Sequence, residues 1–440
     1  MFKGLNILFL SRAFAKCLLF IAPLSFANQK VPDGELMLGF PPSSDSQVTF
    51  ANYLNYPNSK WSFNHAGAPL NVVVLPRSGQ LVSFKENLVP NLGSKKILLG
   101  NNKQQSLAAV FTNNETDGIV IVKNNEIKYE RYWNYGDKDR HHIWFSATKS
   151  LVSAAIGLLV EQGKVDLNAS PVKYIPELVN SGFARTTIQQ VLNHRTSIDF
   201  KENYTDLNSN FFKFYAPALN MAWLPGGRDV QPDKDKIYGV HDFLAKYIKA
   251  DPKSSPDEVF DYNSANADVI GWLIARVSGM PLNEFIRKNI WSKLQVEHDA
   301  FMAVDRAYMA VATGGMNTTA RDAARLGVMI MNDGRYNGQQ ILPKQWLEQI
   351  TQLSVIDKQR MKANPKYREE PWQAYKNMWW VLDAGQGEFA AVGIYGQVIY
   401  INKAQNVVAA YFSSQPVASA AKNQMFRDKL SAIRQVARDL

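Results

Sequence analysis

The 440-residue sequence contains a single cysteine, Cys17, and no apolar run long enough to span a bilayer as a helix. One cysteine excludes an intrachain disulfide and a cysteine-rich metal site. The motif Gly-x-Ser-x-Gly, which carries the nucleophile of α/β-hydrolases, is absent, and so is the zinc-binding motif His-Glu-x-x-His. The adjacent histidines His141 and His142 have the wrong spacing for two ligands on one helix face. We expect no metal site there, and we expect both side chains at the surface or behind other functional groups.

The first 27 residues predict a signal peptide. Three basic residues precede an apolar stretch, residues 17–27, which ends in small side chains of the kind that a signal peptidase recognises. Cleavage after Ala27 would remove the only cysteine and lower the formal charge of +10 by three. We therefore expect a secreted, periplasmic protein without a stable membrane span after cleavage. An uncleaved membrane anchor is the alternative.

The composition is that of a folded globular protein. Hydrophobic residues make up 46% of the sequence and charged residues 20%, which excludes wholesale disorder. The net charge of +10 could suggest a nucleic-acid partner. However, the Lys and Arg residues are dispersed, and no basic stretch is interleaved with aromatic residues. We therefore expect no nucleic acid partner.

The sequence after the predicted signal peptide falls into two regions. Residues 28–110 are rich in proline, asparagine and serine, which predicts an irregular extension packed on a main domain at 111–440. Within that domain, Gly118–Val122 and Ile127–Tyr132 are short apolar or alternating runs, and the four residues between them include Asn124 and Asn125. This pattern predicts a β-hairpin that leads toward Ser146.

The rest of the main domain changes from helices to strands. Helical patterns dominate to about residue 350, with a mostly helical insertion at about 160–350. Two strands are predicted at Gln397–Ile401 and Val407–Phe412, followed by an amphipathic helix at Ala420–Leu440. Strands at both ends with helices between them predict an α/β fold. In this fold an antiparallel sheet is built from both termini, flanked by helices, and interrupted by the helical insertion.

The tetrad Ser146-Ala147-Thr148-Lys149 begins an apolar helical pattern that ends near Gly163. Residues three apart share a helix face, so a hydroxyl and an amine come together. A buried lysine without a carboxylate partner can stay neutral and take the serine proton. Backbone N–H groups at the helix start can also stabilise an anion beside the serine. The tetrad therefore predicts a serine nucleophile with a lysine base.

Two further Ser-x-x-Lys sequences show that the spacing alone has little weight. Ser170 precedes Pro171, which is typical of a helix cap with proline at the first position. Ser419 lies so near the C-terminus that little sequence remains to supply partners. A capping serine with a solvated lysine is also an alternative for Ser146 itself.

A second polar group, Tyr262-Asn263-Ser264, follows Ser146 by about a hundred residues. A phenol near a lysine can share the proton transfer from the nucleophile to the leaving group. Taken alone, Tyr-x-Ser is more typical of a core tyrosine beside a capped helix start.

The order Ser146-x-x-Lys149, Tyr262-x-Ser264 and a late glycine segment resembles the serine β-lactamase and penicillin-binding-protein superfamily. The resemblance covers about residues 115–435. Within the superfamily the sequence is most similar to the esterase and nylon-oligomer (aminohexanoate-dimer) hydrolase branch. The segments Trp61–His65 and Gly393–Gln397 resemble the nylon-oligomer hydrolases, and Val191–Ile198 resembles a loop of the esterase-type members. Gly163–Val172 and Thr313–Thr319 are similar to segments that recur in the superfamily as a whole.

The resemblance implies roles for particular residues. Ser146 would be the nucleophile, and Lys149 and Tyr262 would carry its proton. The backbone N–H groups of Ser146 and Gln397 would form the oxyanion hole. The predicted substrate-binding residues are Ser264, Ile394, Tyr395 and Gly396. No cofactor is implied.

Two positions depart from the pattern of the superfamily. Relatives that bind a substrate carboxylate carry Lys or His at the place of Ile394, and isoleucine cannot pair with a carboxylate. Ser197 stands where relatives often have glycine, so we expect a different turn geometry there.

We therefore predict a secreted serine hydrolase that cleaves a small-molecule ester or amide through an acyl-serine intermediate. A β-lactamase or a D-Ala-D-Ala carboxypeptidase is an alternative. A slowly acylating sensor and a structural envelope protein on the same fold are two further alternatives.

Overall fold

The computed structural model describes residues 35–204, 206, 208–221, 237–418 and 423–440. The predicted signal peptide, residues 1–27, lies outside the described residues. Within the described ranges, no helix combines the length and the apolar character needed to cross a membrane.

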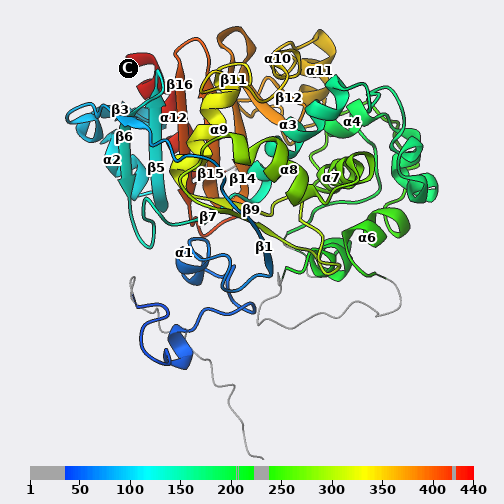
Figure 1. Ribbon diagram of the computed structural model, residues 1–440, viewed down its shortest axis with the longest axis horizontal. Helices are drawn as coiled ribbons and strands as arrows, with labels where there is room; N and C mark the ends of the chain where they lie inside the picture. Colours follow the sequence, from blue (N-terminus) through cyan, green and yellow to red (C-terminus); the bar gives the residue numbers. More distant parts are fainter. Residues whose placement is uncertain (1–34, 205, 207, 222–236, 419–422) are drawn as a thin grey trace, which may run out of the picture.

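An eight-stranded sheet joins the two ends of the chain, as predicted. The hairpin of β5 and β6 pairs through β5 with β16, so the N-terminal and C-terminal strands lie side by side (Figure 1). Asn124 and Asn125 both adopt positive φ in the hairpin turn, a conformation that asparagine tolerates well. In sheet order the strands are β12 (Ala374–Lys376), β13 (Trp379–Asp383), β14 (Glu388–Gly393), β15 (Gln397–Asn402), β16 (Val407–Ser413), β5 (Thr116–Lys123), β6 (Glu126–Tyr132) and β2 (Lys85–Glu86).

The region before residue 111 is more regular than its composition predicts. Strand β2 pairs in parallel with β6 at the edge of the main sheet. Strand β1 (Val72–Leu75) pairs with β8 (Ala300–Ala303) in a four-stranded sheet that β9 (Met316–Thr318) and β7 (His142–Ile143) complete. A short hairpin of β3 (Lys96–Leu98) and β4 (Gln104–Ser106) follows. Strands β1 and β2 pair with segments far along the sequence, and β3 and β4 have only three residues each, so local patterns do not reveal these strands.

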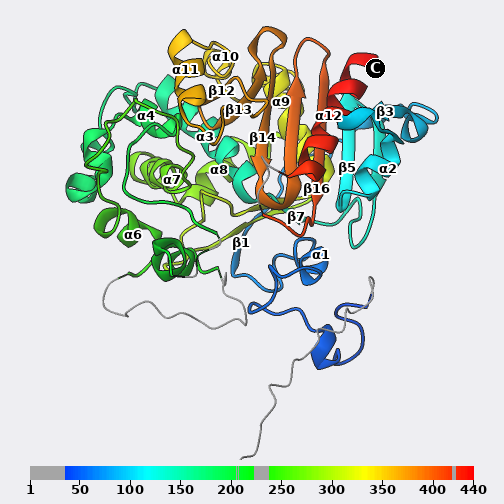
Figure 2. The same ribbon diagram turned by 180° about the vertical axis from the view of Figure 1, so that it is seen from behind.

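Helices cover both faces of the main sheet. Figures 1 and 2 show α9 (Ala320–Met331) on one face and α12 (Gln424–Asp439) on the other, with α2 (Leu107–Thr112) beside α12. Gly327 brings α9 close to the sheet, because a Cβ there would lie 2.5 Å from the Val408 side chain.

The helical part of the molecule lies beside the sheet, and α3 runs between the two (Figure 1). Helix α3 (Thr148–Glu161) ends at Gly163 as predicted, and α7 (Ala265–Ser278) ends in the same way at Gly279, both glycines with positive φ. The predicted cap at Ser170 is confirmed, since its side chain accepts from Val172 N–H ahead of a short 3₁₀ helix. The helices of this part are α3 (Thr148–Glu161), α4 (Ile188–Leu192), α5 (Ala216–Ala218), α6 (Val240–Lys246), α7 (Ala265–Ser278), α8 (Leu282–Asn289), α10 (Lys344–Glu348) and α11 (Val355–Ala363), and the short helix α1 (Asn58–Ser62) lies below the sheet.

Candidate active site

Ser146 lies in a tight turn between β7 and α3. Phe145, directly before it, adopts φ +45°, an uncommon conformation for a residue other than glycine. Hydrogen bonds from residues before and after Ser146 join the turn to Met316 of strand β9. Trp144 N–H donates to Met316 O at 2.8 Å, and Met316 N–H donates to Thr148 Oγ1 at 3.1 Å. The half-buried Ser146 is thereby presented on a rigid turn at the start of α3.

Lys149 is 1% exposed and points along α3 toward the serine. Its Nζ donates to Ser146 Oγ at 2.7 Å and to Thr313 O at 2.8 Å. Burial lowers the pKa of Lys149 to about 8, against the opposing effect of the Glu202 and Asp268 carboxylates. The spacing in the tetrad therefore brings together a hydroxyl and an amine that is readily deprotonated near neutral pH.

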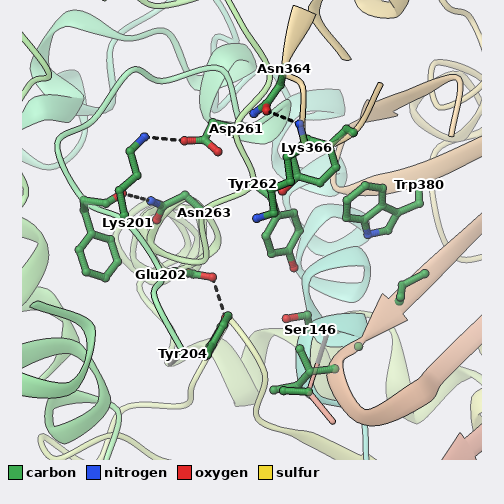
Figure 3. Close-up of a pocket in the computed structure, with 16 residues that line it drawn as sticks. Ser146, Lys201, Glu202, Tyr204, Asp261, Tyr262, Asn263, Asn364, Lys366 and Trp380 are labelled. Carbon is green, nitrogen blue, oxygen red and sulfur yellow. Dashed lines mark hydrogen bonds and ion pairs between the residues drawn. The ribbon is translucent and has the colours of Figure 1, made fainter. Parts of the chain in front are cut away.

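Tyr262 approaches the same serine from the loop before α7. Figure 3 shows its hydroxyl pointing toward the Ser146 side chain. Trp380 stacks on the Tyr262 ring at 5.4 Å, and Lys149 Nζ lies 5.2 Å from the ring centre. Burial raises the pKa of the Tyr262 phenol, so the hydroxyl keeps its proton in the resting protein.

His194 supports the Tyr262 loop from behind. Its Nδ1 accepts a hydrogen bond from Asn263 N–H at 3.1 Å, and its ring lies 4.9 Å from that of Tyr262. Burial and the nearby Lys149 lower the pKa of His194 well below its usual value, so the imidazole is neutral. Ser197, three residues on, has φ +53° and thus adopts the left-handed conformation that glycine favours.

Ser264 is the N-cap residue of α7 and is 5% exposed. Its backbone N–H donates to the carboxylate of Glu202, which also accepts from the Tyr204 hydroxyl at 2.8 Å (Figure 3). No pattern in the sequence points to Glu202 or Tyr204 as site residues. Both follow His194 in a loop without periodicity, so only their proximity in space reveals them.

The segment Gly393–Gln397 lies on the opposite side of the site. Gly393 lies against the serine turn so closely that a Cβ there would be 2.2 Å from Trp144 O. Gln397 begins β15, and its side chain is held by Ser413. Gln397 Nε2 donates to Ser413 O at 2.7 Å, and Ser413 N–H donates to Gln397 Oε1 at 3.0 Å. This double hydrogen bond fixes the backbone at the strand start.

A cavity of about 610 Å³ opens beside Ser146, and its walls are mainly aromatic and apolar. Of the predicted site residues, Ser146, Tyr262 and Ile394 line the cavity, and Figure 3 labels the first two. Lys149, Ser264, Gly396 and Gln397 are buried and do not line it. The complete lining is Ser146, Phe200, Lys201, Glu202, Tyr204, Asp261, Tyr262, Asn263, Asn364, Lys366, Tyr367, Trp380, Val392, Gly393, Ile394 and Ala418.

Tyr395 differs from the expectation of a substrate-binding side chain. The residue has φ +62°, is 7% exposed, and packs its ring at 5.4 Å from Phe145 instead of lining the cavity. The left-handed backbone turns the side chain away from its neighbour Ile394. Of these two residues, Ile394 is the one that faces the cavity.

The two adjacent histidines have different surroundings. His142 is not at the surface: it is 2% exposed, and its Nε2 lies 3.0 Å from Asp117 Oδ2. His141 contacts Asp299 O and packs against Phe301. Among the residues that the structure describes, no group of three or more His, Cys, Asp or Glu side chains could hold a metal ion.

The sheet built from both termini and the Ser146–Lys149–Tyr262 arrangement define a β-lactamase-type hydrolase. The Beta-lactamase family model matches residues 107–432, and the chain belongs to this family.

Two relatives are similar over nearly the whole chain. The 6-aminohexanoate-dimer hydrolase of Paenarthrobacter ureafaciens is 26% identical over 377 residues, which are 86% of this chain and 91% of the relative. A solved Bacillus anthracis structure, provisionally designated a 6-aminohexanoate-dimer hydrolase, has 27% identity and a TM-score of 0.78, covering 89% of this chain and 97% of its own. The structure of EstCE1, a hydrolase with promiscuous acyltransferase activity, shares the fold at 13% identity and a TM-score of 0.55, covering 74% of this chain and 97% of its own. The chain is a hydrolase of the serine β-lactamase type.

Proposed function

We propose that this hydrolase cleaves a small-molecule ester or linear amide through an acyl-serine intermediate. One observation carries the proposal: a fully buried lysine with a pKa near 8 donates to Ser146 Oγ at 2.7 Å at the wall of the cavity. After it loses its proton, the same nitrogen can accept the serine proton and activate the nucleophile.

The reaction runs in two halves. Ser146 Oγ attacks the carbonyl carbon while its proton passes to Lys149, with Tyr262 sharing the transfer. The backbone N–H groups of Ser146 and Gln397 stabilise the oxyanion. The proton then moves to the leaving alcohol or amine, and the acyl group stays on Ser146. Water attacks this ester, gives its proton to the same relay, and releases the acid and the free serine.

The walls of the cavity support an uncharged acyl group near the nucleophile. Ile394 and Val392 line it beside Ser146, and Trp380 and Tyr367 add aromatic surface. The Paenarthrobacter ureafaciens relative is named a 6-aminohexanoate-dimer hydrolase, and an amide bond can join two such amino acids. Linear amides and esters are therefore the substrate class that we propose.

Replacement of the nucleophile tests the proposal. Ser146→Ala is expected to abolish hydrolysis of p-nitrophenyl esters and covalent labelling by a fluorophosphonate, with the melting temperature retained. The matched control is Ser170→Ala, which alters the other described Ser-x-x-Lys sequence at a helix cap and should keep both activities. Labelling or turnover that survives in Ser146→Ala would exclude Ser146 as the nucleophile. A stable acyl-serine in the intact mass without turnover would instead favour the sensor.

We also propose that the hydrolase is secreted, because basic residues followed by the short apolar stretch 17–27 are typical of a cleaved signal. N-terminal sequencing of the protein from its native host should then begin at Asn28. A sequence that starts at Met1 would refute the proposal.

A further inference from the structure

A short helical segment from outside the matched family domain packs against the two loops that flank the candidate active site. The α1 segment, defined here as residues 53–65, precedes the family match at residue 107 by more than forty residues. Figures 1 and 2 show α1 below the end of the main sheet, next to β7. The segment reaches the serine turn through its backbone, since Ile143 N–H donates to Phe63 O at 3.0 Å.

The Phe63 side chain lies between the two loops that carry the proposed catalytic groups. Its ring is 1% exposed and lies 4.9 Å from Phe145 and 5.1 Å from Tyr395. Phe145 directly precedes Ser146, and Tyr395 lies two residues before Gln397. The three rings thus form one cluster, because Phe145 and Tyr395 also lie 5.4 Å apart.

Both ring partners of Phe63 have an unfavourable backbone conformation. Phe145 has φ +45° and Tyr395 has φ +62°, and such residues keep a left-handed conformation only where the surrounding packing holds them. These two residues set the direction of the chain into the nucleophile and into the oxyanion strand. The packing of Phe63 against both rings is therefore one of the contacts that hold the two loops at a fixed separation.

The α1 segment is itself firmly anchored. Lys60 is 3% exposed, and its Nζ lies 3.0 Å from Glu115 Oε2. Ser414 N–H donates to Glu115 O at 2.9 Å, which ties the same residue to the chain that follows β16. Ser62 Oγ donates to Tyr53 O at 2.5 Å within the segment. Phe63 is thus presented from a rigid support.

We propose that Phe63 is a positioning residue that sets the distance between Ser146 Oγ and the backbone N–H of Gln397. It touches no reacting atom and acts through Phe145 and Tyr395. The proposal rests on the proposed function, because it assumes that Ser146 is acylated and that Gln397 N–H stabilises the oxyanion. The predicted consequence is an effect on transition-state stabilisation and not on the binding of substrate.

The test compares Phe63→Ala and Phe63→Leu with Phe183→Ala and Phe183→Leu. Phe183 is also fully buried but lies in the helical part, in the 3₁₀ helix Gly182–Arg185. For Phe63→Ala, kcat on a p-nitrophenyl ester should fall by up to about a hundredfold, the scale of a 1 Å misplacement. KM should change little, and the fluorophosphonate labelling rate should fall with kcat. Phe63→Leu should likewise lower kcat with little change in KM, but by a smaller factor. If Phe63→Ala does not fold, the kcat and KM of Phe63→Leu test the positioning role.

A double variant tests whether Phe63 acts through the ring cluster. The kcat losses of Phe63→Leu and Tyr395→Leu should combine to less than their product, because both changes open the same contact. If Phe63→Leu matches Phe183→Leu in kcat per folded molecule, or alters only KM, the positioning role is refuted while the proposed function stands. If the wild-type protein shows neither ester turnover nor labelling at Ser146, the proposed function itself fails and this inference fails with it.

Discussion

Lys149 and Asp268 are joined through a single residue, Thr313. Lys149 Nζ donates to Thr313 O at 2.8 Å, and Thr313 N–H donates to Asp268 Oδ1 at 3.0 Å. Asp268 is buried in α7, where burial raises its pKa to about 7, and the Tyr215 hydroxyl donates to its other oxygen. A buried carboxylate therefore lies close enough to affect the charge of Lys149 without direct contact.

This relationship predicts the pH dependence of hydrolysis. The base must be neutral, so kcat/KM should rise with pH up to about 8 and fall about tenfold per unit below it. In Asp268→Asn a negative charge that favours the protonated amine is lost, so the pKa of Lys149 falls further and the midpoint moves to lower pH. The control Asp166→Asn, at an exposed turn, should leave the midpoint unchanged. A midpoint that moves to higher pH in Asp268→Asn would contradict the argument.

The shared role of Lys149 and Tyr262 predicts a non-additive double variant. Lys149→Ala and Tyr262→Phe should each lower kcat by at least about a hundredfold, the usual scale for the loss of a general base. Because Lys149 donates to Ser146 and the Tyr262 hydroxyl points toward the same serine, removal of one disables the relay on which the other depends. The double variant should therefore lose little more than the worse single variant. Losses that multiply in full would mean that the two residues act independently.

Local patterns predicted the parts of the fold that depend on neighbours in sequence. The β5–β6 hairpin and the C-terminal helix α12 have clear periodicity in the sequence, and the structure contains both. The tetrad spacing likewise predicted that Lys149 meets Ser146, because residues three apart share a helix face.

Contacts between distant segments were not predictable in this way. Glu202 lies in an irregular loop, and its place beside Ser264 depends on how that loop folds against α7. Phe63 comes from a region whose composition predicted only an irregular extension, yet it packs against Phe145. The direction of the Tyr395 ring follows from a positive φ that the residue type does not indicate. Asp268 could have been found, since an acidic residue on the apolar face of a predicted helix is an uncommon feature.

A second buried lysine predicts how stability varies with pH. Lys429 of α12 donates to Ser413 Oγ and to Asn114 O, and burial lowers its pKa to about 7. Between pH 7 and about 9 the unfolded chain therefore holds a proton that the folded protein lacks. Unfolding takes up this proton, so the free energy of unfolding rises with pH by up to about 1.4 kcal/mol per unit from this group.

The substitution Lys429→Met should remove this rise, because it leaves no titrating group at the site. Guanidinium unfolding at pH 7, 8 and 9 measures the slope for the wild type, for Lys429→Met and for the exposed control Lys358→Met. The control should keep the slope of the wild type. An unchanged slope in Lys429→Met would mean that Lys429 keeps its proton in the folded protein.

The wall beside Ser146 predicts a poor β-lactamase and a better esterase or amidase. A β-lactam brings a carboxylate into the cavity, and Ile394, which lines it, has no charge to pair with that carboxylate. The missing charge-assisted hydrogen bond is worth about 1.5–3 kcal/mol, a factor of roughly ten to a hundred and fifty in rate. Two lysines, Lys201 and Lys366, line the cavity. Lys201 forms an ion pair with Asp261, with 2.6 Å between Lys201 Nζ and Asp261 Oδ2.

The substitution Ile394→Lys should therefore raise the ratio of cephalosporin to ester hydrolysis, measured as kcat/KM for a chromogenic cephalosporin and a short p-nitrophenyl ester. Ile394→Leu is the matched control, because it keeps the apolar wall and should leave the ratio near that of the wild type. Neutral acyl groups need no cation, so the ester rate should change less than the cephalosporin rate. If the wild type already prefers the cephalosporin, another group must hold the carboxylate. The exposed Lys366 at the cavity would then be the side chain to replace, because its ammonium is the other cation there.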